Sequence, residues 1–145
     1  MKKEQEDLML KEICARMPYG VSVYYADYDD YYPVKGIRKS PLGYFELELD
    51  AVESSIYCSI DEVKLCLLPM SNITEEQYDE LERMTLNDYM DHMRITNELR
   101  EKVDFITHWP LYSPDVIDWF NRNHFDYRGL IEMGLALKAP DGMYK

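Results

Sequence analysis

A chain of 145 residues that is 46% apolar and 13% aromatic can bury a core and fold as one ordinary domain. Its 28 acidic and 16 basic residues give a net charge of −12, which disfavours direct nucleic acid binding and favours a partner with a basic surface. No apolar run approaches the roughly 20 residues of a membrane span, so we expect no membrane insertion.

The cysteines and the first residues both indicate a cytoplasmic location. Cys14, Cys58 and Cys66 are an odd number without close spacing, which favours free thiols over a disulfide framework or a zinc site. The first twelve residues, MKKEQEDLMLKE, are too acidic and too polar for a signal peptide.

The first predicted element is a helix over residues 4–17, which Pro18 ends. Its apolar positions follow the i, i+3, i+4, i+7 spacing of one stripe: Leu10, Ile13, Cys14 and Met17.

Five strand-like segments follow the helix. Each is short, rich in β-branched or aromatic residues, and bounded by Asp, Gly, Pro or Ser. They span residues 20–25, 31–38, 42–49, 55–60 and 64–68, with turns at 27–30 and 40–43. So many short strands, the last two joined by a tight Asp-Glu-Val step, favour a small SH3-like antiparallel β-barrel.

A helical middle segment is predicted to begin after Thr74, because Thr74 and Gln77 have the spacing of a capping box. This helix is expected to reach about residue 83, with Tyr78 and Leu81 facing inward. A further helix to about residue 102 and an irregular linker over 104–114 follow.

The C-terminal segment is predicted to be a helix and a turn. Ser113 and Pro114 suit the start of a helix that ends near Asn123. Asp126 suits the start of a short turn that Gly134 ends in a left-handed conformation, and residues 135–137 add an extended segment. We expect the large apolar residues of this segment to be buried against the barrel and the first helix: Trp119, Phe120, Phe125, Tyr127, Leu130 and Leu135.

The predicted fold class is therefore α+β. It comprises an N-terminal helix with an SH3-like barrel over residues 1–73, an acidic helical segment over 74–112 and a C-terminal helix-turn clip over 113–145. The clip is expected to pack on the barrel, so that the chain forms a single compact unit.

Two segments resemble a family of small uncharacterised proteins from gut anaerobic bacteria and their phages. They are LLPMSNITEEQYDEL, residues 67–81, and VIDWFNRNHFDYRGLIEMGLALKAPDGMY, residues 116–144. Members share a Pro-Met-Ser…Thr-Glu-Glu junction and an Asp-Trp-Leu-Asn…His-Phe-Asp-Tyr-Arg-Gly-Leu-Ile signature. The resemblance covers about a third of the chain, and residues 85–107 look like an addition to the family's shorter form. It implies a cytoplasmic protein encoded by a phage or mobile element, and it implies no activity.

The sequence lacks the motifs of common catalytic sites. It has no Gly-rich phosphate loop, no HExxH, no paired CxxC and no GxSxG. We therefore expect a protein that is not an enzyme and that has no catalytic residues, metal site or cofactor.

His124 is the best candidate for acid–base or ligand chemistry. Asp118 or Asp126 would orient it as a base. In a nucleotide-type ligand site, Arg122 and Arg128 would meet a phosphate beside His124. The simpler interpretations are an Asp118–Arg122 ion pair along the helix and a structural role for the histidine. On the acidic middle segment, Asp88, Asp91 and His92 are more typical of a solvated face than of a metal site.

The stretch YGVSVYYADYDDYYP, residues 19–33, argues most for binding. Alternate tyrosines of a strand pair face the core, and the others are rigid rings of the kind that binding surfaces favour. With aspartates between them, the natural target is a basic, partly apolar protein surface, and SH3-type modules hold extended peptides in an aromatic groove. The predicted binding residues are Tyr25, Asp27, Tyr28, Asp29, Asp30, Tyr31 and Tyr32.

These observations predict a non-enzymatic protein-interaction module that acts on a basic protein of the host. The alternative is a protein that binds or sequesters a small nucleotide-type ligand.

Overall fold

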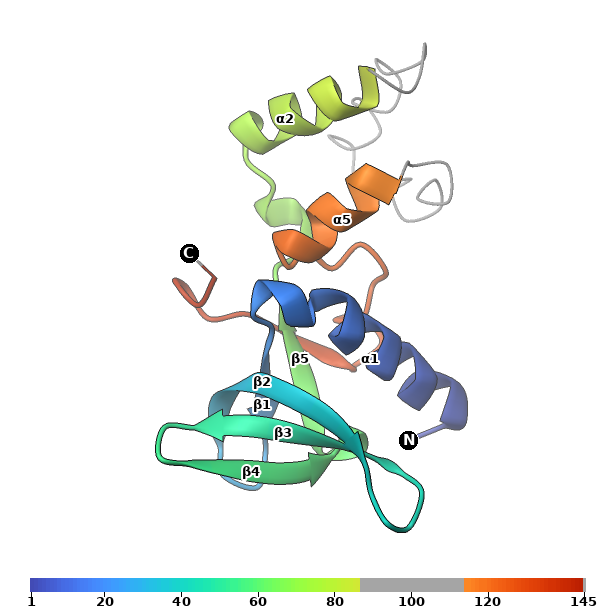
Figure 1. Ribbon diagram of the computed structural model, residues 1–145. Coiled ribbons are helices and arrows are strands. Elements are labelled where there is room, and N and C mark those ends of the chain that lie inside the picture. The colour runs from blue at the N-terminus through green and yellow to red at the C-terminus, as the bar shows by residue number, and fades with distance from the viewer. Residues whose placement is uncertain (87–113, 145) are drawn as a thin grey trace. The chain divides into compact units, whose positions relative to one another are not determined.

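The computed structural model describes residues 1–86 and 114–144, which Figure 1 shows as coloured ribbon. The chain divides into two compact units, Met1–Leu67 with Leu130–Lys145 (unit 1) and Leu68–Gly129 (unit 2). The segment predicted over 113–145 contributes to both units. The second helix of the predicted middle segment and the linker after it lie outside the described residues.

Unit 1 combines the N-terminal helix α1 (Lys3–Arg16) with a six-stranded mixed sheet (Figure 1), so the α+β class is confirmed. The strands lie in the order β4-β3-β2-β1-β5-β6, antiparallel except for the β5–β6 pair. All five predicted strands are present: β1 (Ser22–Tyr25), β2 (Asp30–Lys39), β3 (Phe45–Ala51), β4 (Ser54–Ser59) and β5 (Val63–Leu67). β6 (Ala136–Lys138) corresponds to the predicted extended segment, and its parallel pairing was not predicted.

The sheet is open rather than a closed barrel, because β4 and β6 form its two edges in the described strand order. β6 occupies the second edge of β5, which pairs with β1 on its other side. The long strand β2 serves both halves of the sheet. Its first residues pair with β1, and those from Val34 onward pair with β3 after a bulge between Val34 and Gly36.

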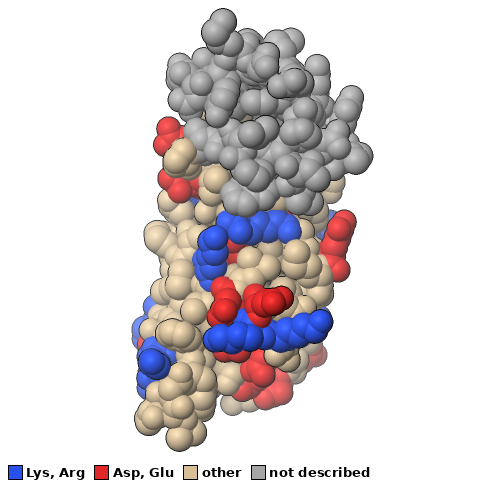
Figure 2. All heavy atoms as spheres, turned by 90° about the vertical axis from the view of Figure 1, so that its right-hand side faces the viewer, with Lys and Arg blue, Asp and Glu red and all other residues tan. Residues whose placement is uncertain are grey.

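The charged side chains on the surface are mixed in sign. On the face shown in Figure 2, acidic and basic side chains alternate among wide uncharged areas. On β2 and β3, Lys35 pairs with Glu48 and Arg38 with Glu46. The net charge of the chain therefore does not indicate where on this surface a basic partner would bind.

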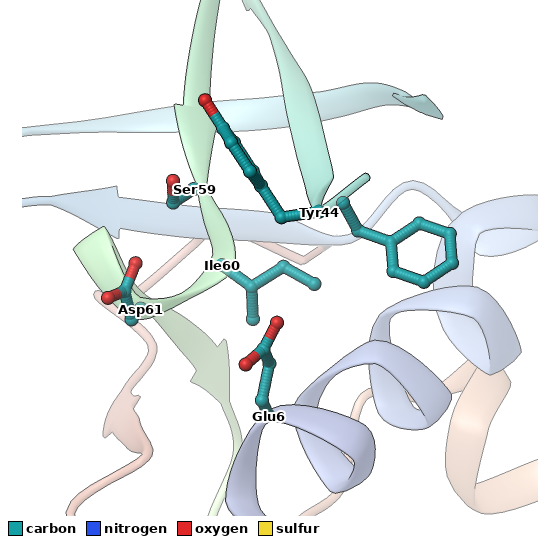
Figure 3. A pocket seen from close by; sticks show the side chains of 6 residues that line it. Glu6, Tyr44, Ser59, Ile60 and Asp61 are labelled. Atoms are coloured by element: carbon teal, nitrogen blue, oxygen red, sulfur yellow. The ribbon is translucent and has the colours of Figure 1, made fainter. Parts of the chain in front are cut away.

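The β3–β4 hairpin meets α1 at one of its ends, where residues of both surround a hollow of about 200 Å³ (Figure 3). The lining residues are Glu6, Tyr44, Phe45, Ser59, Ile60 and Asp61.

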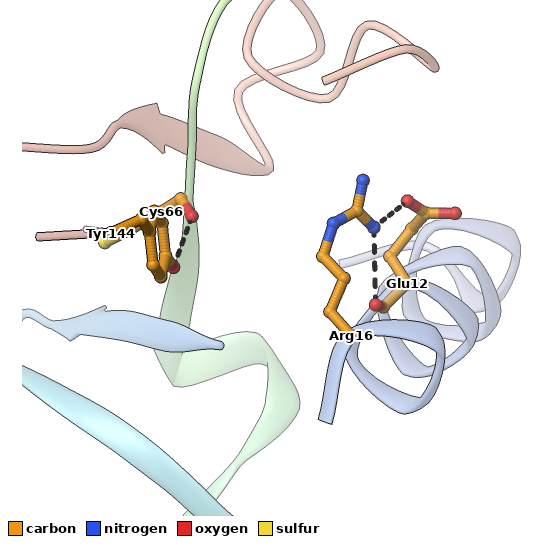
Figure 4. A network of polar contacts seen from close by, with 4 residues as sticks. All are labelled: Glu12, Arg16, Cys66 and Tyr144. Carbon is orange, nitrogen blue, oxygen red and sulfur yellow. Dashed lines mark hydrogen bonds and ion pairs between the residues drawn. The ribbon is translucent and has the colours of Figure 1, made fainter. Parts of the chain in front are cut away.

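The apolar stripe predicted for α1 is rotated in the structure. Cys14 is exposed, whereas Met9, Glu12, Ile13 and Arg16 are fully buried. Glu12 and Arg16 form a buried ion pair within the helix (Figure 4). Two of the four fully buried residues of α1 are thus charged, and the spacing of apolar residues in the sequence could not predict them.

The C-terminal Tyr144 is anchored between β1 and β5. Its hydroxyl accepts a hydrogen bond from the Ser22 amide at 3.0 Å. It donates one to the Cys66 carbonyl at 2.7 Å, which Figure 4 shows as a dashed line. The described β1–β5 ladder ends at the pair Val23 and Leu65, so the hydroxyl takes the place of the next backbone rung. Burial raises the pKa of Tyr144, so the phenol stays protonated.

Unit 2 contains α2 (Glu75–Leu86) and α5 (Pro114–Arg122). The predicted capping box is confirmed: the Thr74 amide donates to Gln77 Oε1 at 2.9 Å, and the Gln77 amide donates to Thr74 Oγ1 at 3.2 Å. Side chains of both helices share one core with a residue before α2 and two after α5: Ile73, Tyr78, Leu81, Val116, Trp119, Phe120, Phe125 and Tyr127.

α5 ends in a Schellman motif, in which His124 adopts a left-handed conformation with φ of 60°. The Phe125 amide donates to the Phe120 carbonyl at 3.0 Å, and the His124 amide donates to the Asn121 carbonyl at 3.2 Å. Phe125 also stacks on Trp119, with ring centroids 5.6 Å apart. A histidine, rather than the neighbouring asparagine, therefore provides the turn that ends this helix.

The burial predicted for the C-terminal segment is confirmed, because its six large apolar residues are at most 6% exposed. Leu130 and Leu135 belong to the core of unit 1, with residues of α1 and the sheet. The four aromatic residues instead share the core of unit 2 with α2, so the prediction that they pack on the barrel was wrong. Gly134 has φ of 76°, the predicted left-handed conformation.

Candidate functional site

The tyrosine- and aspartate-rich stretch forms the β1–β2 hairpin of unit 1. Tyr24 lies opposite Tyr31, and Tyr25 lies opposite Asp30. The two strands are joined by a tight turn in which the Asp29 amide donates to the Ala26 carbonyl at 3.2 Å. Asp29 has φ of 48°, which aspartate tolerates better than most residues. The seven predicted binding residues are therefore brought together at one end of the sheet.

One face of this hairpin carries Tyr24 and Tyr31, whose ring centroids are 5.4 Å apart. The Tyr24 hydroxyl donates to Asp29 Oδ1 at 2.6 Å. This bond, ahead of the smaller effects of burial and nearby charge, raises the pKa of Tyr24. Asp29 thus holds the turn together.

The opposite face carries Tyr25, Tyr28 and Tyr32. Tyr28 is 59% exposed and packs against Tyr25 and Tyr32, at centroid distances of 5.2 and 6.4 Å. Burial, and then the charge of Asp30, raise the pKa of Tyr32. The rings are ordered by one another, so a ligand that contacts them would lose little of its binding free energy to ordering them.

Two carboxylates converge on the Tyr25 hydroxyl. Its oxygen lies 3.0 Å from Glu62 Oε2 and 3.2 Å from Asp27 Oδ2. A phenol has one proton to donate, so only one of these carboxylates accepts it at a time, and the exposed oxygens that do not are left to water. Burial, and then the bond to Glu62, raise the pKa of Tyr25, so the phenol remains neutral.

No ion pair formed within residues 1–86 and 114–144 involves Asp27, Asp30 or Glu62. Asp27 and Glu62 are both exposed. This part of the hairpin therefore presents negative charge beside exposed aromatic rings, and the charge of these three carboxylates is not neutralised by an ion pair within the described residues.

Glu62 was missed by the sequence analysis. It lies in the short 3-10 turn Ile60–Glu62, where its side chain also accepts from the Ser59 amide at 3.3 Å. The sequence marks this Asp-Glu-Val step as a turn, but its proximity to Tyr25 depends on the β1–β5 pairing.

The alternative ligand residues are less favourably placed. Arg122 is exposed in the last turn of α5, whereas His124 is only 3% exposed. The Arg128 guanidinium lies 5.4 Å from the centre of the neighbouring Tyr127 ring. His124 has a structural role as the residue that ends α5, and its carbonyl accepts from the Leu68 amide at 2.8 Å.

The acidic residues proposed to orient His124 differ in environment. Asp118 is exposed on α5, and Asp126 is buried, with its amide donating to the Leu68 carbonyl at 2.9 Å. Asp88, Asp91 and His92 lie outside the described residues. Among the residues that the structure describes, no three His, Cys, Asp or Glu side chains are grouped to hold a metal ion.

The three cysteines are free in the structure, with Cys14 exposed and the other two buried. Burial raises the pKa of both Cys58 and Cys66 to about 12. The two buried thiols are therefore protonated and unreactive at neutral pH.

Comparison of the chain with protein-family models, with curated proteins and with solved structures finds no match. None of the helices in the described part of the chain has the length and apolar character to cross a membrane.

Proposed function

We propose that the protein is a non-enzymatic interaction module whose β1–β2 hairpin binds a basic segment of another protein. The observation that carries this proposal is the pair of carboxylates, Asp27 and Glu62, on the single phenolic proton of Tyr25. A lysine or arginine side chain of a partner would replace water as the donor to these carboxylates and neutralise their charge.

An exposed aromatic ring adds contact area beside this charge. Tyr28 lies on the same face of the hairpin as Tyr25, is 59% exposed and packs against the Tyr25 ring. Tyrosine contributes a large amphipathic surface at a small entropic cost, and a cation can also lie over its ring. These features support a partner segment in which basic and apolar residues are neighbours.

The finer parts of the proposal rest on the sequence. We place the protein in the cytoplasm and assign it to a phage or mobile element because of the C-terminal resemblance. An SH3-like curvature of the sheet would give an extended peptide a groove along the tyrosines.

A display library of 12-residue peptides tests the proposal. Wild-type protein should enrich peptides with Lys or Arg next to aromatic or aliphatic residues. The variant Asp27→Asn/Glu62→Gln should bind the enriched peptides about tenfold more weakly, because two exposed ion pairs contribute on the order of 1–2 kcal/mol together.

The matched control is Asp50→Asn/Glu53→Gln, which removes two charges around the β3–β4 turn. Asp50 and Glu53 are exposed. Equal loss of affinity in both variants would mean that net charge alone drives binding, and unchanged affinity in the Asp27/Glu62 variant would contradict the proposal.

Binding of a nucleotide-type ligand is the alternative function, and it rests on Arg122, His124 and Arg128. The burial of His124 and the overall negative charge weigh against it. A nucleotide that raises the melting temperature in proportion to its excess would favour this alternative.

A further inference from the structure

The hollow between α1 and the end of the β3–β4 hairpin is a second place where acidic and aromatic groups meet (Figure 3). Its two rings, Tyr44 and Phe45, remain 43% and 37% exposed. Ile60 is 1% exposed and gives the hollow an apolar floor. Glu6 extends from α1 toward Ile60 in Figure 3.

The lining of the hollow is negative and contains no basic residue. Glu6 and Asp61 supply two carboxylates, and neither takes part in an ion pair with another described residue. The neighbour of Glu6 in the chain, Asp7, does pair, with Lys3 at 3.2 Å, so a lysine is nearby on α1 but is engaged elsewhere. The hollow is therefore complementary to a cation that the described chain does not itself provide.

Its size restricts the ligand further. Pockets for drug-sized molecules span about 300–1,000 Å³. This hollow of about 200 Å³ is smaller, so it fits one side chain rather than a nucleotide. Two carboxylates would in addition repel a phosphate.

We propose that this hollow holds an arginine side chain of the partner that binds the β1–β2 hairpin. The inference rests on the proposed function and names a second contact for the same partner. Arginine fits better than lysine, because its planar guanidinium stacks on aromatic rings while its donors reach carboxylates.

The 3-10 turn Ile60–Glu62 connects the two sites. Asp61 lines the hollow, and the next residue, Glu62, belongs to the carboxylate pair at Tyr25. A partner segment with two basic residues would therefore reach both sites across a single turn of this chain.

Titration of the full-length ¹⁵N-labelled protein with the peptide acetyl-Gly-Gly-Arg-Gly-Gly-amide tests the inference by NMR. The matched peptide carries citrulline, a neutral side chain of the same shape, in place of arginine. The arginine peptide should shift the amide signals of Glu6, Ser59 and Asp61 in a saturable manner, and the citrulline peptide should not. Similar shifts with both peptides, or no shifts at the hollow, would overturn the inference without any variant.

Substitutions then assign the contact. Glu6→Gln/Asp61→Asn should weaken binding of the arginine peptide at the hollow about tenfold, as expected for the loss of two exposed ion pairs. The control Asp50→Asn/Glu53→Gln removes the same charge at the opposite end of the hairpin and should leave it unchanged. Equal affinity in the Glu6/Asp61 variant and the wild type would also overturn the assignment.

Peptides from the display library separate this inference from the proposed function. If their affinity falls with Asp27→Asn/Glu62→Gln and not with Glu6→Gln/Asp61→Asn, the hollow is wrong and the function stands. If both pairs of substitutions weaken binding, the two sites act on one partner. If neither does, both proposals fail.

Discussion

At the scale of single residues, Glu12 and Arg16 show how a charge can belong to a core. Both side chains are at most 1% exposed, and Arg16 donates to the Glu12 carboxylate and also, at 3.4 Å, to the Glu12 carbonyl. Desolvation of two charges opposes their attraction, so such a pair contributes little net stability compared with apolar residues of similar size.

Removing one partner of this pair should lower the free energy of unfolding, whereas replacing both residues by apolar ones should change it little. Glu12→Gln or Arg16→Met alone leaves a buried charge and should lower the free energy of unfolding by about 3–5 kcal/mol. The double variant Glu12→Leu/Arg16→Met should recover most of that loss. Urea unfolding measures all three.

The exposed Lys3–Asp7 pair on the same helix is the control for Glu12 and Arg16. Its side chains are 76% and 61% exposed, so Asp7→Asn should change stability by less than about 1 kcal/mol. A double variant as unstable as the worse single variant would contradict this account of the buried pair.

A second prediction concerns the left-handed backbone conformation of His124. A left-handed conformation costs an ordinary residue about 1–2 kcal/mol relative to glycine. Both His124→Ala and His124→Gly remove the imidazole, so their difference isolates the backbone contribution, and the glycine variant should be the more stable by about 1 kcal/mol. At the exposed helical position Asp118 the order should reverse, because glycine destabilises a helix interior. The same order at both positions in thermal unfolding would refute the Schellman assignment.

At the scale of elements, the sequence correctly predicted those features that are determined by residues close together in the chain. The five strands, the Thr74 capping box and the left-handed Gly134 were correct because alternation, cap spacing and glycine at a helix or turn end are local signals. The rotated face of α1, the parallel β5–β6 pair and the place of Glu62 beside Tyr25 were not predicted, because each requires a contact between segments distant in the sequence. The sequence therefore predicted the hairpin residues of the candidate site. It did not predict the contribution of the turn Ile60–Glu62, which the fold brings next to Tyr25.

Tyr144 also contacts residues distant in the sequence, Ser22 and Cys66. Its hydroxyl should contribute measurably to the free energy of unfolding of unit 1. Tyr144→Phe leaves the Ser22 amide and the Cys66 carbonyl without this partner and should lower the free energy of unfolding by about 1–3 kcal/mol at pH 7.

The same hydroxyl should make stability depend on alkaline pH. The pKa of Tyr144 is raised above its ordinary value of 10.0 by burial, so the phenol ionises in the unfolded chain before it does so in the fold. Its contribution is therefore complete below pH 10 and is lost as the pH rises above 10. Tyr25, Cys58 and Cys66 act in the same direction, since their pKa values are also raised. Urea unfolding between pH 8 and 11 should show a steeper decline for the wild type than for Tyr144→Phe, and equal slopes would contradict the buried position of this phenol.

At the scale of the whole molecule, the net charge of −12 is distributed over acidic residues that form ion pairs and acidic residues that do not. Acidic residues on β3 pair with Lys35 and Arg38, and on α1 Asp7 pairs with Lys3. The carboxylates at the hairpin and at the hollow have no such pairs among the described residues, which is also true of Asp50 and Glu53, and they differ from these two by the aromatic rings beside them. Binding sites are often less stable than the rest of a fold would allow, because their groups are arranged for a partner rather than for one another.

The most direct test measures stability and binding on one variant, Asp27→Asn/Glu62→Gln. The introduced amide groups can donate to the Tyr25 oxygen and relieve the contact between acceptors, and the side-chain carbonyl that replaces the Glu62 carboxylate still accepts from the Ser59 amide. Urea unfolding and fluorescence titration with a basic peptide from the display library would be compared with the wild type and with Asp50→Asn/Glu53→Gln. We expect a free energy of unfolding equal to or above that of the wild type together with about tenfold weaker peptide binding, and no weakening of binding in the control variant. A variant that is less stable than the wild type but binds the peptide equally well would show that the carboxylate pair serves the fold and not a partner.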